Sequence, residues 1–475
     1  MEFVQYLNQF MNEYGWKFEE ISDEIWAFAE TRFQEKYSSA LQANVMRDWG
    51  FRVQMGLAGE ETAFLAEYGE GKPVIAMLGE YDALEGMSQR ADVPFHDPLV
   101  MDGPGHGCGH NLLGVGAMAA AIALKEYARE NNIPGTIRYY GCPAEENAGG
   151  KAFLVREGLF DDCDVALYWH PFAYNRVEYG SSNANYRVLF TFHGTSSHAA
   201  SAPHLGRSAL DAVELMDVGV NYMREHMIDE ARVHYAITDP GGNAPNVVQS
   251  RAQVLYAIRA PKVGQVDALY ERICKIAKGA AMMTETEVEI RQVAAYSNMI
   301  ANTVVSDELE RAMLEVAPIG YSPEELAYAA AFTESLPPQT KETLREKLIH
   351  LYGPEQGAIE AEKPINSGYA AISKYEGMKG SADLGDVSWV VPAGYFYGTT
   401  WSTGTPPHTW QACAQGKSSI AHKGMLRAAK ILALTGLRFL ESPELVAAAW
   451  ENHRIMLNGE SYPNPLKPEC KPEVW

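Results

Sequence analysis

The hydrophobic pattern of the first 180 residues predicts strands that alternate with helices. Apolar residues recur at helical spacing from Tyr6 to Trp49, and again from Leu113 to Tyr127. Short apolar runs between and after these stretches predict strands at 51–53, 62–66, 74–79, 136–140 and 164–169. A further helix is predicted at 151–157. The run at 74–79 is continuously apolar, as in a strand buried on both faces. The alternation predicts an α/β domain with a mostly parallel sheet and helices on both faces, an α/β/α sandwich.

The pattern changes near Asn185, where we predict an inserted domain. Its expected elements are a strand, a helix, two strands, a helix and a strand, at 186–193, 208–227, 233–238, 251–260, 266–283 and 287–295. This βαββαβ order is typical of a ferredoxin-like fold. We place the insertion at 186–298, because the chemistry of the segment 1–185 resumes in the segment 299–475.

The last part of the chain predicts helices and one long loop. Residues from about 306 to 363 are rich in Glu and predicted to be mostly helical, with Pro337-Pro338 as a break. They offer no candidate site. Residues 394–408 are rich in Gly, Thr and Pro, which predicts a loop. Residues 423–440 predict a closing helix.

Length and charge narrow the class of protein. A chain of 475 residues is too long for one ordinary core, which agrees with two domains. The net charge of −22 argues against nucleic-acid and anionic-membrane partners, because phosphates would be repelled. Neither a secretory signal nor an apolar run of membrane-spanning length is expected. The six cysteines are scattered singly, unlike a disulfide framework, so we expect a cytoplasmic protein.

Cys108 and His110 offer two metal ligands separated by one residue. On extended backbone these positions point the same way, and the flanking glycines allow an ion to approach the backbone closely. Thiolate and imidazole are common ligands of zinc. Two other interpretations stay open: a buried free thiol beside an unrelated histidine, and a cysteine nucleophile activated by histidine.

Glu145 and Glu146 follow the predicted strand 136–140, at the carboxyl end where ligand sites of open α/β sheets gather. Adjacent side chains diverge on non-helical backbone. One carboxylate can therefore bind a metal ion while the other moves a proton from metal-activated water. The alternative is an acidic loop at a helix start, where carboxylates favour the helix dipole.

His170 and His408 are two further candidate ligands. His170 follows the apolar strand 164–169 and precedes a proline, and His408 lies in a loop that two prolines hold rigid. Either can instead be an ordinary, partly buried histidine. With the three ligands above they make five, which is too many for one catalytic zinc ion with an open position. Five ligands suit two ions that share one ligand, so the sequence predicts a two-metal hydrolase.

Longer motifs around these residues resemble a known family. They are the runs at 79–84, 105–114, 140–146, 197–200, 203–212 and 404–411. The chain resembles, over nearly its whole length, the dinuclear metallopeptidases that include aminoacylases, carboxypeptidases and hippurate hydrolases. The resemblance is greatest to the branch that acts on aminobenzoyl-glutamate.

The resemblance implies two divalent ions, zinc or manganese, bridged by Cys108. The other ligands would divide between the ions, with His110 and His170 on one and Glu146 and His408 on the other. Glu145 would be the general base and then the general acid. Asp82 would orient a ligand from outside the coordination sphere.

The same resemblance makes the inserted domain a lid and a dimerisation domain. His198 would reach the active site of the partner subunit and stabilise the oxyanion. Asn246 and Arg259 would hold the carboxylate of the substrate, which arginine can bind with two hydrogen bonds. From the residues alone, His198 can equally cap a helix and Arg259 form a surface ion pair. We expect a homodimer, with a related second subunit as the alternative.

The expected activity is hydrolysis of the amide bond of an N-acyl amino acid by a metal-bound hydroxide. The resemblance favours p-aminobenzoyl-glutamate or a similar aromatic-acyl amino acid, because Asn111-Leu112-Leu113 replaces the Asp and second His of hippurate-type relatives. The alternatives are an aminoacylase or dipeptidase of different preference, a cysteine-nucleophile hydrolase, and a catalytically inactive binding subunit. An intact ligand set beside Glu145 argues against an inactive protein.

Overall fold

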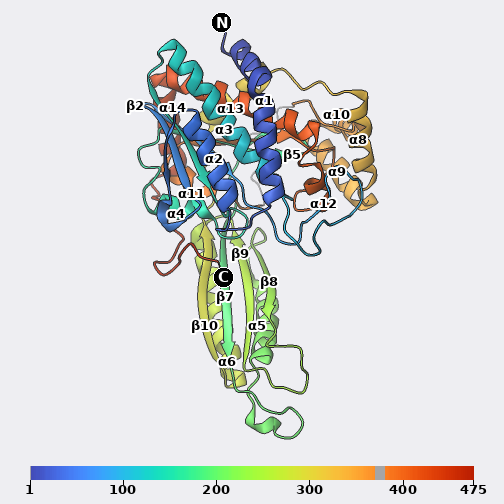
Figure 1. Cartoon of the computed structure of the whole chain (residues 1–475). Coiled ribbons are helices and arrows are strands. Elements are labelled where there is room, and N and C mark those ends of the chain that lie inside the picture. Colours follow the sequence, from blue (N-terminus) through green and yellow to red (C-terminus); the bar gives the residue numbers. More distant parts are fainter. Residues whose placement is uncertain (1, 370–379, 475) are drawn as a thin grey trace.

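The structure, a computed structural model, describes residues 2–369 and 380–474. A broad α/β part holds most of the helices, and a narrow part built of one sheet and two long helices projects from it (Figure 1). We call the narrow part the lid, as the sequence predicted. The domain boundaries at 185/186 and 298/299 stay predictions, and the sheet of the lid spans residues 184–296.

The broad part is built on a seven-stranded sheet in the order β1-β2-β4-β3-β5-β11-β6. Its strands are β1 (Arg52–Met55), β2 (Phe64–Glu70), β3 (Val74–Glu80), β4 (Gly135–Cys142), β5 (Val165–Phe172), β6 (Arg176–Val177) and β11 (Ala393–Thr399). The four central strands β4, β3, β5 and β11 are parallel, and the edge strands are antiparallel. Every residue of β3 is buried, as its continuous apolar run predicted. The prediction of a mostly parallel α/β sheet is confirmed.

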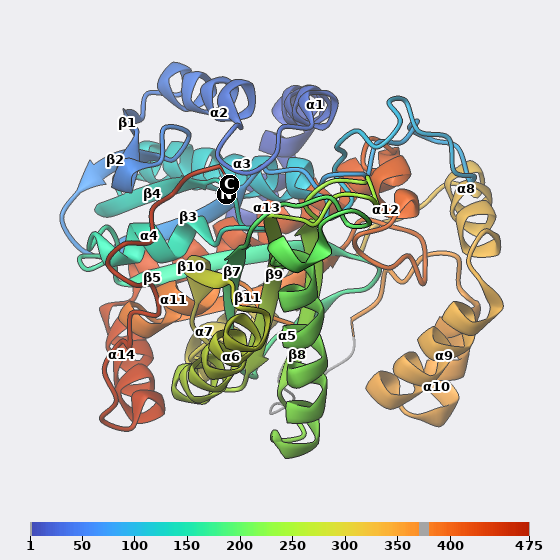
Figure 2. The ribbon, with the colours of Figure 1, turned by 90° about the horizontal axis from the view of Figure 1, so that it is seen from below.

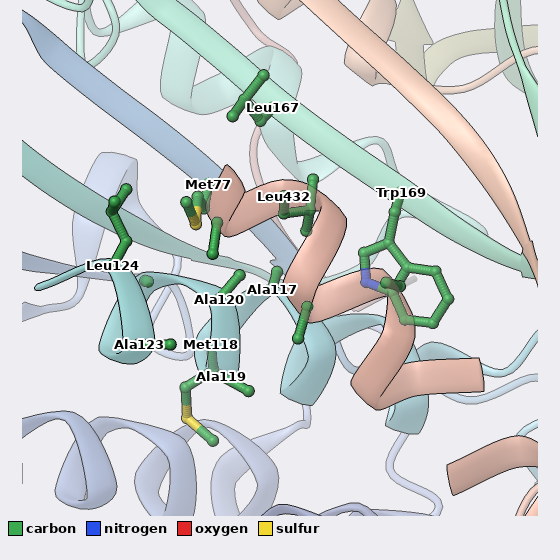
Figure 3. Packing of buried hydrophobic residues seen from close by; sticks show 14 of the residues in the cluster. Met77, Ala117, Met118, Ala119, Ala120, Ala123, Leu124, Leu167, Trp169 and Leu432 are labelled. Atoms are coloured by element: carbon green, nitrogen blue, oxygen red, sulfur yellow. The ribbon is translucent and has the colours of Figure 1, made fainter. Parts of the chain in front are cut away.

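Helices cover both faces of this sheet (Figure 2). One face carries α1 (Phe3–Phe28), α2 (Lys36–Asp48), α3 (His110–Asn131) and α13 (Ser419–Glu441), and the other α4 (Gly150–Arg156) and α11 (Leu384–Val390). The helix α14 (Pro443–Leu457) packs against α7 (Thr303–Glu315) and α13. The small side chains along α3, among them Ala117 and Ala120, let α13 approach closely, so that Leu432 and Met77 fill the core between them (Figure 3).

The lid has the predicted βαββαβ order. It contains β7 (Ala184–His193), α5 (Ala209–Met223), β8 (Arg232–Asp239), β9 (Arg251–Ala260), α6 (Val263–Thr284) and β10 (Glu287–Tyr296). The antiparallel sheet has the order β10-β7-β9-β8, in which the fourth and first strands are neighbours. Alternate residues of β9 are buried against α5 and α6. The ferredoxin-like layout is therefore confirmed.

The predicted loop at 394–408 is partly wrong. Residues 393–399 form β11, which pairs with β5 on one side and β6 on the other. The aromatic residues Tyr395, Phe396 and Tyr397 favour a strand. Gly394 and Gly398 misled the prediction: they allow close packing, since an added Cβ at Gly394 would lie 2.6 Å from the Val305 side chain. The remainder, up to His408, lies outside regular strands and leads into α12 (Trp410–Gln415).

The Glu-rich segment is helical, as predicted. After α7 it forms α8 (Pro323–Glu334), α9 (Pro338–Tyr352) and α10 (Pro354–Glu362). Pro338 occupies the first turn of α9, where its missing N–H costs no helical hydrogen bond. These helices lie beside the broad part, at the end of the sheet where the candidate site is found (Figure 2).

Trp169 of β5 packs against α3 in the core. Its indole is fully buried, donates to the Leu113 carbonyl at 3.0 Å, and packs where an added Cβ on Gly116 would lie 2.7 Å away. We expect Trp169→Ala to lower the free energy of unfolding by about 3–5 kcal/mol. Urea denaturation measures this loss. Trp16→Ala is the control: Trp16 is 53% exposed, and its loss should change stability by about 0.5 kcal/mol or less.

Candidate metal centre

The candidate residues gather at the carboxyl ends of the central parallel strands. Glu145 and Glu146 follow β4, His170 lies near the end of β5, and His408 follows β11. A cavity of about 880 Å³ opens there, lined by Cys108, both glutamates and both histidines. This is where open α/β sheets hold their ligands, because the crossing helices leave that edge accessible.

A left-handed turn brings Cys108 and His110 together. Gly109 between them has φ 79° and ψ 22°, and His110 is the first residue of α3. The expectation that extended backbone aligns the two side chains is therefore wrong. Only glycine adopts this conformation without strain, and an added Cβ would lie 3.0 Å from Pro171.

Two sets of possible ligands share the Cys108 sulfur. In the first, Sγ of Cys108 lies 3.4 Å from Nε2 of His170, and a ring nitrogen of His110 completes the set. In the second, Nε2 of His408 lies 3.3 Å from Oε2 of Glu146. Within each set, the candidate ligand atoms all lie within 4.8 Å of one another. The structure thus brings all five predicted ligands to one place, with Cys108 between the two sets.

Asp82 forms a hydrogen bond with one residue of each set. Its Oδ1 accepts from Nδ1 of His110 at 2.8 Å, and its Oδ2 accepts from the backbone N–H of Glu146 at 2.9 Å. Nε2 of His110 lies 3.3 Å from Oε2 of Glu80 and 4.0 Å from Oε1 of Glu146, and neither Nε2 nor Oε1 has a hydrogen-bond partner among the described residues. Buried polar atoms rarely stay unpaired. A cation near these two atoms would satisfy both, so the donor set fits a metal ion.

Neighbouring charges shift the pKa values at this centre. Burial and Glu146 raise the pKa of the Cys108 thiol, but His170 and His110 outweigh them and bring it down to about 6. Burial raises the pKa of Glu146 as well, yet the hydrogen bond with His408 and the nearby His110 bring it to about 2. Both groups are therefore deprotonated at neutral pH, as a thiolate or carboxylate ligand must be.

Glu145 differs from its neighbour. Burial, followed by the charges of Glu80 and Glu146, raises the pKa of Glu145 well above its usual value. Its Oε2 lies 4.0 Å from Nε2 of His110, and the side chain lines the cavity. A carboxyl group with a raised pKa accepts a proton more readily than an ordinary carboxylate does. The two adjacent glutamates thus have the divergent environments that the sequence predicted.

A buried ion network that the sequence analysis missed lies behind Glu145. The Lys151 ammonium contacts the carboxylates of Glu80 and of Asp383, the latter at 2.6 Å, and all three side chains are fully buried. Tyr168 donates to the other oxygen of Glu80 at 2.9 Å. Glu80 stood in a recognised motif, but no local pattern links Lys151 to Asp383, because they are far apart in the sequence.

The lid residues separate into two places. Arg259 lines the cavity, and its side chain is half-buried. His198 and Asn246 are exposed on adjacent loops of the lid, where the Ala199 N–H donates to the Asn246 carbonyl at 3.0 Å. Neither lines the cavity of its own chain. Their roles stay predictions, as do those of the other site residues.

The comparison with known proteins decides the family. The sequence model described as Peptidase family M20/M25/M40 matches residues 76–338. The chain belongs to this family. It is 42% identical over 463 residues to one of the subunits of the p-aminobenzoyl-glutamate hydrolase of Escherichia coli (strain K12), and the match covers 96% of each chain. It is 28% identical to the Xaa-Arg dipeptidase of Mus musculus over 462 residues, 94% of this chain and 90% of that protein.

Solved structures of the M20 family share the fold. One described as a dinuclear metal binding peptidase from Bacillus subtilis matches with a TM-score of 0.53 and 16% identity, over 90% of this chain and 99% of that one. Family membership confirms the predicted hydrolase acting on amide bonds. Within residues 2–369 and 380–474, no helix has the length and apolar character that crossing a bilayer requires.

Removal of the cation from the buried network around Lys151 should destabilise the protein strongly. Lys151→Met leaves Glu80 and Asp383 without their shared cation, so we expect a loss of about 3–5 kcal/mol in the free energy of unfolding. Lys36→Met is the control, because its ion pair with Glu61 is exposed and should contribute about 1 kcal/mol or less. Urea denaturation compares the two variants. Equal, small losses would contradict a stabilising role for the buried network.

Proposed function

We propose that this chain is an amidohydrolase with two divalent metal ions that cleaves N-acyl amino acids. The substrate we favour is p-aminobenzoyl-glutamate or a similar aromatic-acyl amino acid. One observation carries the proposal: two sets of ligand atoms share Cys108 beside a protonatable Glu145. The similarity to the p-aminobenzoyl-glutamate hydrolase of Escherichia coli supports the choice of substrate.

The chain's own residues would hold the ions without rearranging the fold. Cys108 would bridge them, His110 and His170 would complete one site, and Glu146 and His408 the other. A sulfur, nitrogen and oxygen donor set suits zinc, and manganese remains compatible with the imidazole and carboxylate ligands. When bound, two such ions would polarise the amide carbonyl and lower the pKa of water.

Glu145 would move the proton in this reaction. It lies in the cavity beside His110 and directly precedes the proposed ligand Glu146 in the chain. As the general base it would take the proton of the attacking water, and as the general acid it would deliver that proton to the amide nitrogen. Burial and the neighbouring carboxylates favour its protonated form, which makes uptake of the proton from the attacking water favourable.

The cavity offers different surfaces to the two ends of the substrate. Arg259 would bind the carboxylate of the leaving amino acid. An aromatic wall starts beside His170 and would contact the acyl group, with Phe172 and Tyr397 at 4.8 Å and Phe172 and Tyr174 at 4.7 Å between ring centroids. Flat rings pack well against such faces.

We further propose a homodimer that forms through the lid. β8 is the edge strand of the lid sheet, and it exposes Tyr235 and Ile237. The neighbouring α5 exposes Val218 and Tyr222, the latter 77% accessible. Exposed apolar side chains along an open edge favour pairing with a second copy. The similarity to a protein described as one of several subunits keeps a related second chain as the alternative.

The cytoplasm is the compartment that we propose. All six cysteines are free thiols, and five of them are buried. Free thiols persist in a reducing compartment. The proposed ligand Cys108 requires the same condition, because a metal ion binds the thiolate and not an oxidised sulfur.

Replacing each of the two glutamates separately by glutamine tests which one moves the proton and which one binds the metal. Glu145→Gln should lower kcat for p-aminobenzoyl-glutamate by about 100-fold or more while the bound metal is kept, since only the proton carrier is lost. Glu146→Gln should lower the metal content itself, because a charged ligand is replaced by a weak one. Turnover assays and elemental analysis of both purified variants measure the difference. Loss of metal in the first variant and not in the second would mean that the roles are exchanged.

Removal of the metal distinguishes the remaining alternatives. Chelation should abolish hydrolysis, and zinc or manganese should restore it. Activity that survives complete removal, together with an acyl-enzyme on Cys108, would instead support the cysteine nucleophile. A metal-loaded wild-type protein that hydrolyses no N-acyl amino acid would support the inactive subunit.

Hybrid dimers test whether His198 acts across the interface. A protomer with Glu145→Ala paired with one carrying His198→Ala has one site in which both residues are intact, provided that His198 belongs to the partner's site. Such purified hybrids should show about half of the wild-type activity, although each homodimer is inactive. Hybrids as inactive as the parents would contradict the cross-subunit role.

A further inference from the structure

Two arginines lie on one face of the lid sheet, where the lid joins the broad part. Arg187 is on β7 and Arg259 on β9, and Arg259 pairs in register with Asn185. Asn185 and Arg187 are two residues apart, so their side chains point to the same face of the sheet. Both arginines line the cavity.

These cations retain donors that the described residues do not use. Arg187 donates to Oδ1 of Asn147 at 2.6 Å and to the Glu146 carbonyl at 2.7 Å, and neither partner carries a compensating charge. The Nε atoms of both arginines are buried without a hydrogen-bond partner among the described residues. Asn185 is fully buried, and its amide oxygen and nitrogen are unpartnered in the same sense.

One monocarboxylate would leave this arrangement incomplete. A single carboxylate takes one guanidinium in a two-hydrogen-bond pair. The second arginine would then remain, partly buried, without a counter-ion, which is costly. The chain as a whole carries a net charge of −22, so two arginines in one cavity without an ion pair to any residue in 2–369 or 380–474 are a local exception to its composition.

We propose that Arg187 binds the side-chain carboxylate of an acidic leaving amino acid while Arg259 binds its main-chain carboxylate. This inference rests on the proposed function, and it makes Arg187 the residue that determines specificity for the glutamate class. A basic leaving residue, such as the name of the similar Xaa-Arg dipeptidase indicates for that enzyme, would place a guanidinium against Arg187.

The test compares leaving groups of different charge, of which glutamate and glutamine also have the same shape. The substrates are p-aminobenzoyl-glutamate, p-aminobenzoyl-glutamine and p-aminobenzoyl-arginine, and the proteins are the metal-loaded wild type, Arg187→Met and Arg187→Lys. The wild type should prefer glutamate to glutamine in kcat/KM by about 10- to 100-fold, the range of a charge-assisted hydrogen bond. Arg187→Met should remove most of this preference, mainly through KM, and Arg187→Lys should restore part of it.

A control separates recognition from support of the metal-binding turn. Asn147→Ala removes one hydrogen bond of Arg187 but keeps its charge. Any effect of that variant should be the same for glutamate and glutamine substrates, and the metal content of every variant is measured alongside. The glutamate-to-glutamine ratio is therefore the decisive quantity, since a purely structural role of Arg187 would change both substrates equally.

The outcomes distinguish this inference from the proposed function. A selectivity ratio that falls in Arg187→Met and partly returns in Arg187→Lys supports it. Hydrolysis of all substrates with no preference for glutamate, or an equal loss on both substrates in Arg187→Met, overturns it and leaves the amidohydrolase intact. A metal-loaded wild type that cleaves none of the substrates overturns the proposed function, and this inference with it.

Discussion

A single carboxylate, Asp82, connects the two halves of the metal centre. It receives one hydrogen bond from the ring of His110 at the start of α3 and another from the backbone of Glu146 after β4. The helix and the turn belong to different crossings of the sheet, and this carboxylate connects them directly. The hydrogen bond also determines which ring nitrogen of His110 faces the cavity. Every chemical step that we propose depends on this alignment.

A buried ion network lies next to the residues that Asp82 connects. Lys151 forms ion pairs with Glu80 and Asp383 in the interior. The charges of these two carboxylates raise the pKa of Glu145. Removing one partner of a buried ion network is costly, but the intact network stabilises the fold no more than apolar packing in its place would. Its place directly behind the candidate base instead indicates an electrostatic purpose. The core is formed elsewhere, by α3, α13 and the central strands.

The sequence predicted which residues the fold brings together better than it predicted the backbone that carries them. Cys108, His110 and the glutamate pair carry ligand chemistry in short motifs, and the positions of strands β4 and β5 follow from apolar runs. The turn at Gly109 was not predicted because glycine adopts both left-handed and extended conformations, and the sequence alone does not distinguish them. β11 was missed since its glycines, which serve close packing, resemble those of a loop. Lys151 was missed for a different reason: its partners come from distant parts of the chain, and only the folded sheet brings them together.

The grip of Arg187 on the Glu146 carbonyl and the Asn147 side chain has a mechanical consequence. The arginine belongs to a strand of the lid, whereas its partners belong to the turn that carries the proposed metal ligand Glu146. Any rotation of the lid about its root strands would break these hydrogen bonds or drag the turn along. Product release and retention of the metal ions would then be coupled through the guanidinium of Arg187. A lid that rotates too freely would lose metal ions from the site.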